Sequence, residues 1–569
     1  MSDALVYDFS QTSRVDPSVF VSKQYLSIND DMNQNYSGGQ CVISTSSLSN
    51  SNKYLDYRSA YLQIPLLLTL TSDTGADGKM APATAATSCD YAISLKSWIG
   101  SVIHNMTIDL NGTTVAQMTN FLPMYNNFKL LTTLSFNDYQ MFSSIGFAKD
   151  DALSVTFQTG NSESGIGVCN NENALTFPTV TGVFNRYGKG NEGLVRRQMY
   201  FNYNPAAVMG TAANAAAHST LLSTTHANQL YKSYIFNKIN ATTSGTVKGV
   251  YQQAIIGTVY LKHLHDFFDK MPLSKGIFMK LTLGISNSSV AFTVASNVIS
   301  NTTVTNPLGG VQCLQIASAL AGNGSRTLPD DNYIASLSVG GKCLNSTQQN
   351  IAGVTQSPLS QSISLNVPSY VFQPQMEIAY LSSPVKRIIY KDLYQFNIQN
   401  VASGSQINSL ISSSIANMKR VICMPFFTAA GNGGSLHQIQ SPFDGAGTGT
   451  LAPYTQLGNF QVVVSGANTF SSTIKYNYEM WNNHVYGTNS INSGQIDGIS
   501  SSLIDSLDWE TCYGYYVADV SRMLSVEDSV PKSLAIQAQN LSGKEIDVFV
   551  FVEYQVDDLQ IDLLTGSRV

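Results

Sequence analysis

The sequence predicts an all-β protein made of two similar antiparallel sandwiches in series, with long loop insertions and few short helices. Charged residues make up 12% of the 569 positions, roughly half of the usual share in soluble domains. Abundant Thr, Val, Ile and Tyr favour strands over long exposed helices, and turn signals recur about every ten residues. Four sequence blocks also occur twice in the same order, which indicates an internal duplication.

The first repeated block predicts a buried strand that contains a proline. YLQIPLL at residues 61–67 corresponds to VICMPFF at residues 421–427. Proline lacks the N–H that a ladder needs and is confined to strand edges and bulges. A proline shared inside both strands is therefore stronger evidence of a duplication than shared apolar residues are. We expect Pro65 and Pro425 to mark bends in equivalent strands.

The second block predicts a strand followed by a tight turn. HNMTIDLNG at residues 104–112 corresponds to GNFQVVVSG at residues 458–466. The pairs Asn111-Gly112 and Ser465-Gly466 favour a turn, in which we expect Gly112 and Gly466 to supply the positive φ. Alternation places three apolar side chains of each copy on one strand face, namely Met106, Ile108 and Leu110 in the first and Phe460, Val462 and Val464 in the second.

Two further blocks complete the repeat. MYNN at residues 124–127 corresponds to MWNN at residues 480–483. The last block, which starts at residue 261 and again at residue 517, predicts a short amphipathic helical turn and two strands around a polar break. The copies lie 360, 354 and 356 positions apart in the first three blocks and about 256 apart in the last. The first copy therefore carries an insertion of roughly one hundred residues, which predicts an outer structure.

These blocks divide the chain into four expected regions. Residues 1–24 form an N-terminal arm, and residues 25–295 form the first sandwich with a large loop insertion at about 130–260. Residues 296–364 form a connector or outer loop, and residues 365–569 form the second sandwich. The connector is rich in Gly, Ser, Thr and Asn, which is typical of a domain boundary.

The charge balance and the cysteines exclude several classes of function. A net charge of −6 with scattered Lys and Arg lacks the basic patch typical of nucleic-acid binding, so no sequence-specific nucleic-acid binding is expected. The N-terminal residues lack the apolar segment of a signal peptide, so synthesis in the cytosol is expected. Seven widely spaced cysteines, none in a CxxC pair, favour reduced and mostly buried thiols.

Two motifs could carry chemistry, and a structural interpretation is favoured for both. GKGNEG at residues 188–193 matches the GxGxxG pattern, but a strand-like segment follows it instead of the helix that would bind pyrophosphate. His263, His265 and Asp266 form an HLHD cluster that lacks a further ligand at a suitable spacing, so surface or helix-cap positions are favoured over a metal site. We therefore expect no catalytic residue, no metal and no cofactor, and a protein that is not an enzyme.

An ordered set of motifs runs along nearly the whole chain: YLQIPLLLTL, IDLNG, LKHLHDFFDKMPLSKGIFMKLTLGISN, SPFDG, NFQVVVSGAN, YGYYVADVSRMLS, LAIQAQNLS and VFVFVEYQVD. This set resembles the double jelly-roll major capsid proteins of virophages, Polinton-like viruses and related small dsDNA viruses. The resemblance implies two consecutive eight-stranded antiparallel jelly-roll sandwiches. Periodicity alone does not separate a jelly roll from an immunoglobulin-like sandwich.

The resemblance also implies a structural function. Such proteins form homotrimers, and these pseudo-hexagonal capsomers tile the icosahedral shell of a virion around a dsDNA genome. The implied partners are neighbouring capsomers, a penton protein and minor or cement capsid proteins, while contact with an internal membrane stays open. Two alternatives stay open as well: a carbohydrate-binding or glycoside-hydrolysing β-sandwich protein, and a trimeric minor capsid or fibre component.

Overall fold

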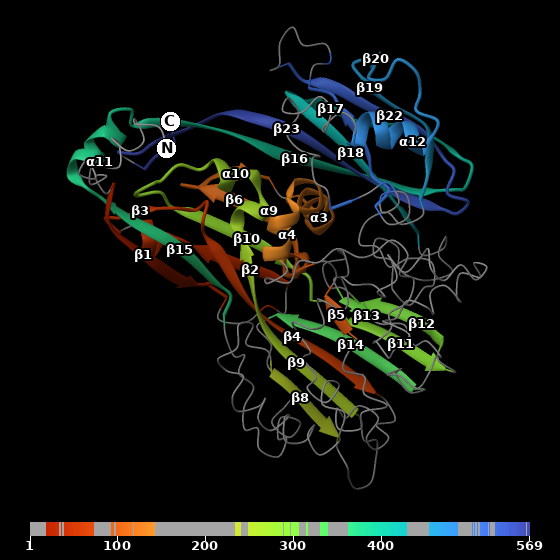
Figure 1. Cartoon of the computed structure of the whole chain (residues 1–569), viewed down its shortest axis with the longest axis horizontal. Helices are drawn as coiled ribbons and strands as arrows, with labels where there is room; N and C mark the ends of the chain where they lie inside the picture. Colours follow the sequence, from red (N-terminus) through yellow and green to blue (C-terminus); the bar gives the residue numbers. More distant parts are fainter. Residues whose placement is uncertain are drawn as a thin grey trace, which may run out of the picture.

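The structure is a computed structural model of the whole chain (Figure 1). It describes residues 19–72, 93–142, 234–239, 249–305, 314–316, 331–339, 362–428, 455–486 and 503–568, with short gaps inside several of these ranges. Two β-sandwiches follow one another along the chain. Two long strands of the second sandwich, β16 (Val385–Val401) and β23 (Ile546–Asp562), extend across the first (Figure 1).

The second sandwich consists of two four-stranded antiparallel sheets, with the orders β16-β23-β18-β21 and β17-β22-β19-β20. Numbered along the chain from one to eight, these strands stand in the orders 1-8-3-6 and 2-7-4-5. This is the strand order of an eight-stranded jelly roll. Its other strands are β17 (Gln406–Ile415), β18 (Met418–Phe427), β19 (Leu457–Val464), β20 (Ala467–Asn468), β21 (Tyr516–Asp519) and β22 (Lys532–Asn540).

The first sandwich has the same order in its eight central strands. β1-β15-β4-β9 corresponds to 1-8-3-6, and the sheet β2-β10-β6-β7 corresponds to 2-7-4-5. The predicted all-β fold with two consecutive jelly rolls is therefore confirmed. These strands are β1 (Phe20–Asn29), β2 (Gln40–Ser44), β4 (Tyr61–Ser72), β6 (Ile103–Leu110), β7 (Thr113–Ala116), β9 (Gly249–Tyr260), β10 (Met279–Ile285) and β15 (Ser364–Phe372).

Additional strands enlarge the first sandwich. Five of them extend the sheet that contains β4, and two form a separate antiparallel pair, β5 with β13. Their bounds are β3 (Tyr54–Leu55), β8 (Tyr234–Ile239), β11 (Ser289–Ala295), β12 (Val298–Thr305) and β14 (Asp331–Val339) in the sheet, and β5 (Ile93–Leu95) and β13 (Leu314–Ile316) in the pair.

Strand pairing places two segments differently from the boundaries expected above. β15 opens the region 365–569 that was assigned to the second sandwich, yet it pairs with β1 and β4 of the first. β14, inside the expected connector 296–364, pairs with residues 66–72 of β4, directly beyond the residues 61–63 that pair with β15. One interrupted strand thus fills the eighth position of the first jelly roll. Its partners lie hundreds of positions away, so local composition did not reveal them.

The expected arm and insertion also overlap strands of the first sandwich. β1 begins at Phe20, so it includes the end of the expected arm 1–24. β9 lies inside the insertion expected at about 130–260, yet it pairs with β4 along the whole length of that strand. Residues 1–18 and 143–233, which hold the rest of the arm and most of the insertion, lie outside the described residues.

Within the described residues the helices are few and short, as predicted. Among those described, the longest is α3 (Leu122–Thr133), which has a proline in its first turn. Backbone N–H groups in the first turn have no acceptor within the helix, so the N–H that proline lacks costs no hydrogen bond there. No helix in the described parts of the chain is long and apolar enough to span a membrane. The others are α2 (Ser46–Ser49), η1 (Ile99–Val102), α4 (Phe136–Phe142), α9 (Leu261–Leu264), α10 (Asp266–Lys270), α11 (Pro374–Leu381), α12 (Asn477–Glu479) and the π-helical η5 (Met480–Tyr486).

The alternating residues of the second repeated block line the core of each sandwich, as predicted. All six are buried, from Met106 in β6 to Val464 in β19. β23 behaves differently, because residues 548–552 (VFVFV) are 0% exposed on both faces. One face packs on the second sandwich and the other is covered by the first. A continuous apolar run, rather than alternation, is what a strand buried on both faces requires.

Candidate functional site at the junction of the two sandwiches

The two sandwiches meet where α3 and α10 of the first pack beside β16 and β23 of the second (Figure 1). This junction gathers the buried charged side chains Asp392, Arg420 and Glu553. Burying charge is costly unless it is paired and hydrogen bonded. Each of these side chains therefore needs a partner of opposite charge or hydrogen-bonding groups around it.

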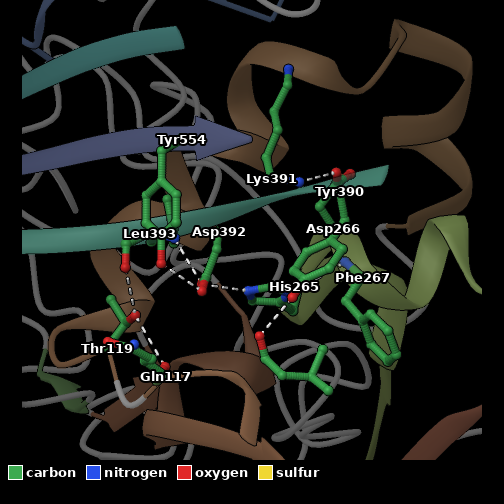
Figure 2. Close-up of polar contacts among 11 residues, drawn as sticks. Gln117, Thr119, His265, Asp266, Phe267, Tyr390, Lys391, Asp392, Leu393 and Tyr554 are labelled. Carbon is green, nitrogen blue, oxygen red and sulfur yellow. Dashed lines mark hydrogen bonds and ion pairs between the residues drawn. The ribbon is translucent and has the colours of Figure 1, made fainter. Parts of the chain in front are cut away.

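His265 connects α10 to the first strand of the second sandwich (Figure 2). It is the N-cap of α10, and its Nδ1 accepts a hydrogen bond from Phe267 N at 3.2 Å. Because Nδ1 accepts, the ring proton lies on Nε2, which donates to Asp392 Oδ1 at 3.2 Å. The neighbouring Asp266 accepts from Lys391 N at 2.9 Å. The HLHD cluster thus supplies a helix cap, as favoured from sequence, but His265 is buried at an interface rather than on the surface.

Asp392 is held by three donors. Besides His265, Leu393 N donates to Oδ1 and the Tyr554 hydroxyl donates to Oδ2, both at 2.8 Å. Burial, together with the charge of Asp392, raises the pKa of Tyr554, so this hydroxyl stays a donor. The carboxylate is 2% exposed. This buried carboxylate thus links α10, β16 and β23 through its three hydrogen bonds.

The chain around β7 adds a second set of contacts to β16. The Tyr390 hydroxyl donates to Val115 O at 2.6 Å, and Thr119 Oγ1 donates to Leu393 O at 3.3 Å. The Tyr390 ring meets Phe267 edge to face, with centroids 5.4 Å apart, a favoured geometry for aromatic pairs. β16 is therefore fixed by two separate segments of the first sandwich.

α3 docks on the second sandwich through Tyr125, whose hydroxyl donates to Glu553 Oε1 at 2.8 Å. Arg420 of β18 holds the same carboxylate, with Nε and Nη2 at 2.9–3.1 Å from its oxygens. Burial alone would lower the pKa of Arg420. The negative charge of Glu553 outweighs this effect, so the pKa of Arg420 is raised. Burial, followed by the charge of Glu553, raises the pKa of Tyr125. One carboxylate thus joins a strand pair of the second sandwich to a helix of the first.

Aromatic pairs lie beside this ion pair and join the two sandwiches. Their ring centroids lie 4.8 Å apart for Phe128 and Tyr515, 4.9 Å for Phe121 and Phe549, and 5.8 Å for Tyr125 and Phe551. In each pair the first residue comes from the first sandwich and the second from the second. Such pairs contribute about 0.5–1.5 kcal/mol each beyond the burial of their surface.

A pocket of about 310 Å³ lies beside these groups. Its basic side chains, which include Lys129, Lys270, Lys391 and Arg420, outnumber its acidic ones. Lys129 Nζ donates to Lys262 O at 3.2 Å, and burial lowers the pKa of this lysine. Across the described residues, no group of three or more His, Cys, Asp or Glu side chains is placed to hold a metal ion.

Pro65 and Pro425 both lie in the third strand of their sandwich, β4 and β18. Each pairs on one side, with β9 and β23 respectively. On the other side of β4, pairing with β15 covers residues 61–63 and pairing with β14 starts at Leu66. On the other side of β18, β21 pairs only with residues 420–423. Within the part of the chain that the structure describes, each proline therefore lies where a strand neighbour is missing on one side, a position that tolerates a missing N–H.

Gly112 and Gly466 lie between the fourth and fifth strands of their sandwiches, with φ of +81° and +84°. The preceding residues, Asn111 and Ser465, also have positive φ, at 48° and 47°, which is the signature of a type I′ hairpin turn. In the first sandwich the turn has a further contact that the sequence did not suggest. Asn111 Nδ2 donates to the Gly566 carbonyl at 2.5 Å, so this turn holds the C-terminal segment of the chain.

Two further candidates from the sequence remain, the GxGxxG pattern and the cysteines. Residues 188–193, which carry the GxGxxG pattern, lie outside the described residues. Cys41 and Cys423 are buried and free, and burial raises the pKa of both thiols, which disfavours a reactive thiolate. The sequence analysis did not predict the roles of Asp392, Glu553 and Tyr125, because no pattern in their neighbouring residues indicates their partners. The MYNN repeat indicated that the segment of α3 is important, but it did not indicate which segment α3 contacts.

Comparisons with known proteins identify the fold but not a family. No protein-family model matches the chain, and no curated protein matches it. Among solved structures, a chain in the structure of the Sputnik virophage is similar at 10% identity, with 98% of this chain and 90% of that chain covered and a TM-score of 0.51. The major capsid protein of mavirus is similar at 10% identity over 98% of this chain and 91% of that chain, with a TM-score of 0.46. With two jelly rolls in series, the chain therefore has a double jelly-roll fold, which it shares with the virophage chain over almost its whole length.

Proposed function

We propose that this chain is the major capsid protein of a small dsDNA virus, with a structural rather than an enzymatic role. Three copies form a pseudo-hexagonal capsomer, and the capsomers tile an icosahedral shell around the genome. The protein is located in the virion after synthesis in the host cytosol. Its partners are neighbouring capsomers, a penton protein and minor or cement capsid proteins.

The observation that carries this proposal is the fusion of two jelly rolls of equal strand order into one block. The junction buries an ion pair, a carboxylate with three donors and several aromatic pairs. Such an interface holds the two sandwiches in one fixed relation, as a building block for a lattice requires. The similar chain belongs to the structure of a virophage, which supports a place for this chain in a virus particle.

A structural role also fits the chemistry of the junction. The buried carboxylates of Asp392 and Glu553 are occupied by donors of this chain. Neither is free to act on a substrate as acid, base or nucleophile. The low share of charged residues, 12%, suits a subunit whose sides are covered by neighbours.

We further propose a division of the chain that follows strand pairing. The first jelly roll comprises residues 20–372, and the second comprises residues 385–562. α11 lies between them. Four residues act as structural positions: Pro65 and Pro425 at strand bends, and Gly112 and Gly466 in hairpin turns.

The test is the native mass of the purified chain, followed by negative-stain imaging of the same fraction. A homotrimer seen as pseudo-hexagonal blocks is the expected result. A monomer would overturn the proposal, and a glycan-binding screen would then address the carbohydrate-binding alternative. A trimer that is elongated and does not tile would favour a fibre or minor capsid component.

A further inference from the structure

The pocket at the junction is built by both sandwiches. α3 and the α9–α10 segment of the first line one side, and β16 and β18 of the second line the other. Four of the lining side chains are cations, Lys129, Lys270, Lys391 and Arg420, whereas Asp266 is the one carboxylate among the described residues that line it. Its volume of about 310 Å³ lies near the lower end of the range for small-molecule sites. The pocket therefore has the size and the charge for a small anion.

Arg420 has hydrogen-bonding capacity that its own chain does not use. Its Nε and Nη2 both donate to Glu553. These two nitrogens share one edge of the planar guanidinium, so Nη1 points away from that carboxylate. Among the described residues Nη1 has no hydrogen-bond partner, although Arg420 is only 9% exposed. A buried N–H without an acceptor is costly, and an acceptor bound in the pocket would remove this cost.

Lys129 faces the pocket with a neutral partner. Its Nζ donates to the Lys262 carbonyl at 3.2 Å, and an ammonium group has three N–H donors. Burial lowers the pKa of Lys129 and the positive charge of Lys391 adds to this effect, which Asp266 offsets only in part. Two ammonium groups from different sandwiches thus repel one another across the pocket. An anion between them would favour the charged form of both.

The carboxylates around the pocket are engaged by other groups. Asp266 accepts a hydrogen bond from Lys391 N at 2.9 Å, and Asp269 pairs with Lys270 at 3.4 Å. Asp392 follows Lys391 in β16, and its side chain points to the opposite face of the strand (Figure 2). The cations that line the pocket therefore outweigh the negative charge that lines it.

We propose that this pocket binds a phosphate group, which links the two sandwiches. The lining groups are mainly donors and cations, so the ligand supplies acceptors and negative charge. A phosphate offers more oxygens than a carboxylate to donors that converge from several sides, and it can carry two charges. Lys129 contacts it from the first sandwich, and Lys391 and Arg420 contact it from the second.

Inorganic phosphate and the phosphates of a nucleotide share this chemistry, and calorimetric titration of the full chain distinguishes them. Inorganic phosphate and ATP are titrated separately in phosphate-free buffer, at an ionic strength held constant with NaCl. We expect saturable binding with a Kd of about 1 mM or below, and an unfolding midpoint that rises with ligand concentration. Tighter binding of ATP assigns the site to a nucleotide phosphate, and equal or weaker binding of ATP assigns it to free phosphate. If neither ligand bound saturably, the proposal would fail.

Variants of the lining lysines place the binding in this pocket. Lys129→Met and Lys391→Met each remove one ammonium group, and each should weaken phosphate binding by at least about tenfold. The second variant keeps the backbone N–H that Asp266 accepts. Lys280→Met, at an exposed position of β10 outside the pocket, is the matched control and should keep the wild-type affinity. Equal weakening in all three variants would assign the binding to overall charge and overturn the proposal.

A conservative variant separates charge from packing. In phosphate-free buffer Lys129→Met should unfold near the wild-type midpoint, because it removes one of two ammonium groups that repel each other. Lys129→Arg keeps the positive charge and should retain phosphate binding within about threefold of the wild type. If Lys129→Arg lost binding as fully as Lys129→Met while both stayed folded by circular dichroism, the charge of Lys129 would not hold the ligand. The inference concerns a single chain, so its failure would leave the proposed capsid role unchanged.

Discussion

The hydroxyl of Tyr125 in the first sandwich donates a 2.8 Å hydrogen bond to Glu553 in the second, across 428 positions of the chain. Glu553 is 0% exposed and is also paired with Arg420. A single buried carboxylate therefore serves both sandwiches. The strength of the junction depends on keeping both of its partners.

We expect Tyr125→Phe to lower the free energy of unfolding by about 1–2 kcal/mol, because Glu553 loses one of its donors while the ring is kept. Urea unfolding followed by tyrosine and tryptophan fluorescence measures the change. Tyr478→Phe, at a hydroxyl exposed to solvent, is the matched control and should change stability little. If both variants lost the same free energy of unfolding, the hydrogen bond to Glu553 would contribute nothing beyond the effect of removing an exposed hydroxyl.

Removing the cation should cost more. Arg420→Met leaves the Glu553 carboxylate buried without a counter-charge, and we expect a loss of about 3–5 kcal/mol. The double variant Arg420→Met/Glu553→Leu removes the charge as well and should recover a large part of that loss. Thermal unfolding of the two variants and of the wild type decides the point. A double variant as unstable as the single one would contradict this account.

The hairpin glycines should tolerate asparagine but not valine. A Cβ at Gly112 or Gly466 meets nothing within 4 Å, so space is not limiting. The cost comes from the backbone, since φ is +81° and +84° and a branched residue avoids this region. We expect Gly112→Val and Gly466→Val each to lose about 1–2 kcal/mol and to lower the yield of trimer.

Asparagine adopts positive φ far more readily than valine. Gly112→Asn and Gly466→Asn should therefore unfold near the wild-type midpoint. Equal effects of Asn and Val would mean that contact, and not backbone conformation, determines the requirement for glycine.

The junction region should lose stability in acid through His104. Burial lowers the pKa of His104 to about 4, while an unfolded chain keeps its ordinary value of about 6.5. The unfolded state therefore binds more protons between these values. The free energy of unfolding should fall by at most about 3 kcal/mol as the pH drops from about 6.5 to about 4.

We expect the free energy of unfolding of His104→Phe to differ less between about pH 7 and about pH 5 than that of the wild type, as measured by urea titration. The new ring would keep the edge-to-face contact with Phe121, which lies 5.3 Å away in the wild type. His263, whose pKa burial lowers to about 3, should leave a residual slope. An unchanged slope in His104→Phe would assign the acid sensitivity to other groups.

The sequence by itself determined the features that depend on local pattern and on repetition. Alternation in β6 and β19 predicted their buried faces, and the pairs Asn111-Gly112 and Ser465-Gly466 predicted the turns, because strand period and turn geometry are properties of a few adjacent residues. The recurrence of four blocks predicted the duplication. These signals sufficed for two β-sandwiches in series.

Only the tertiary structure decided where the first sandwich ends and what joins it to the second. From sequence, β14 was placed in the connector and β15 at the start of the second sandwich. Their membership of the first sandwich depends on pairing with β4, some 270 to 300 positions away. His265, Tyr125 and Glu553 acquire their roles from partners on other segments. A hydrogen bond between distant residues leaves no periodic trace in either one's neighbourhood, so these contacts became visible only when the chain was folded.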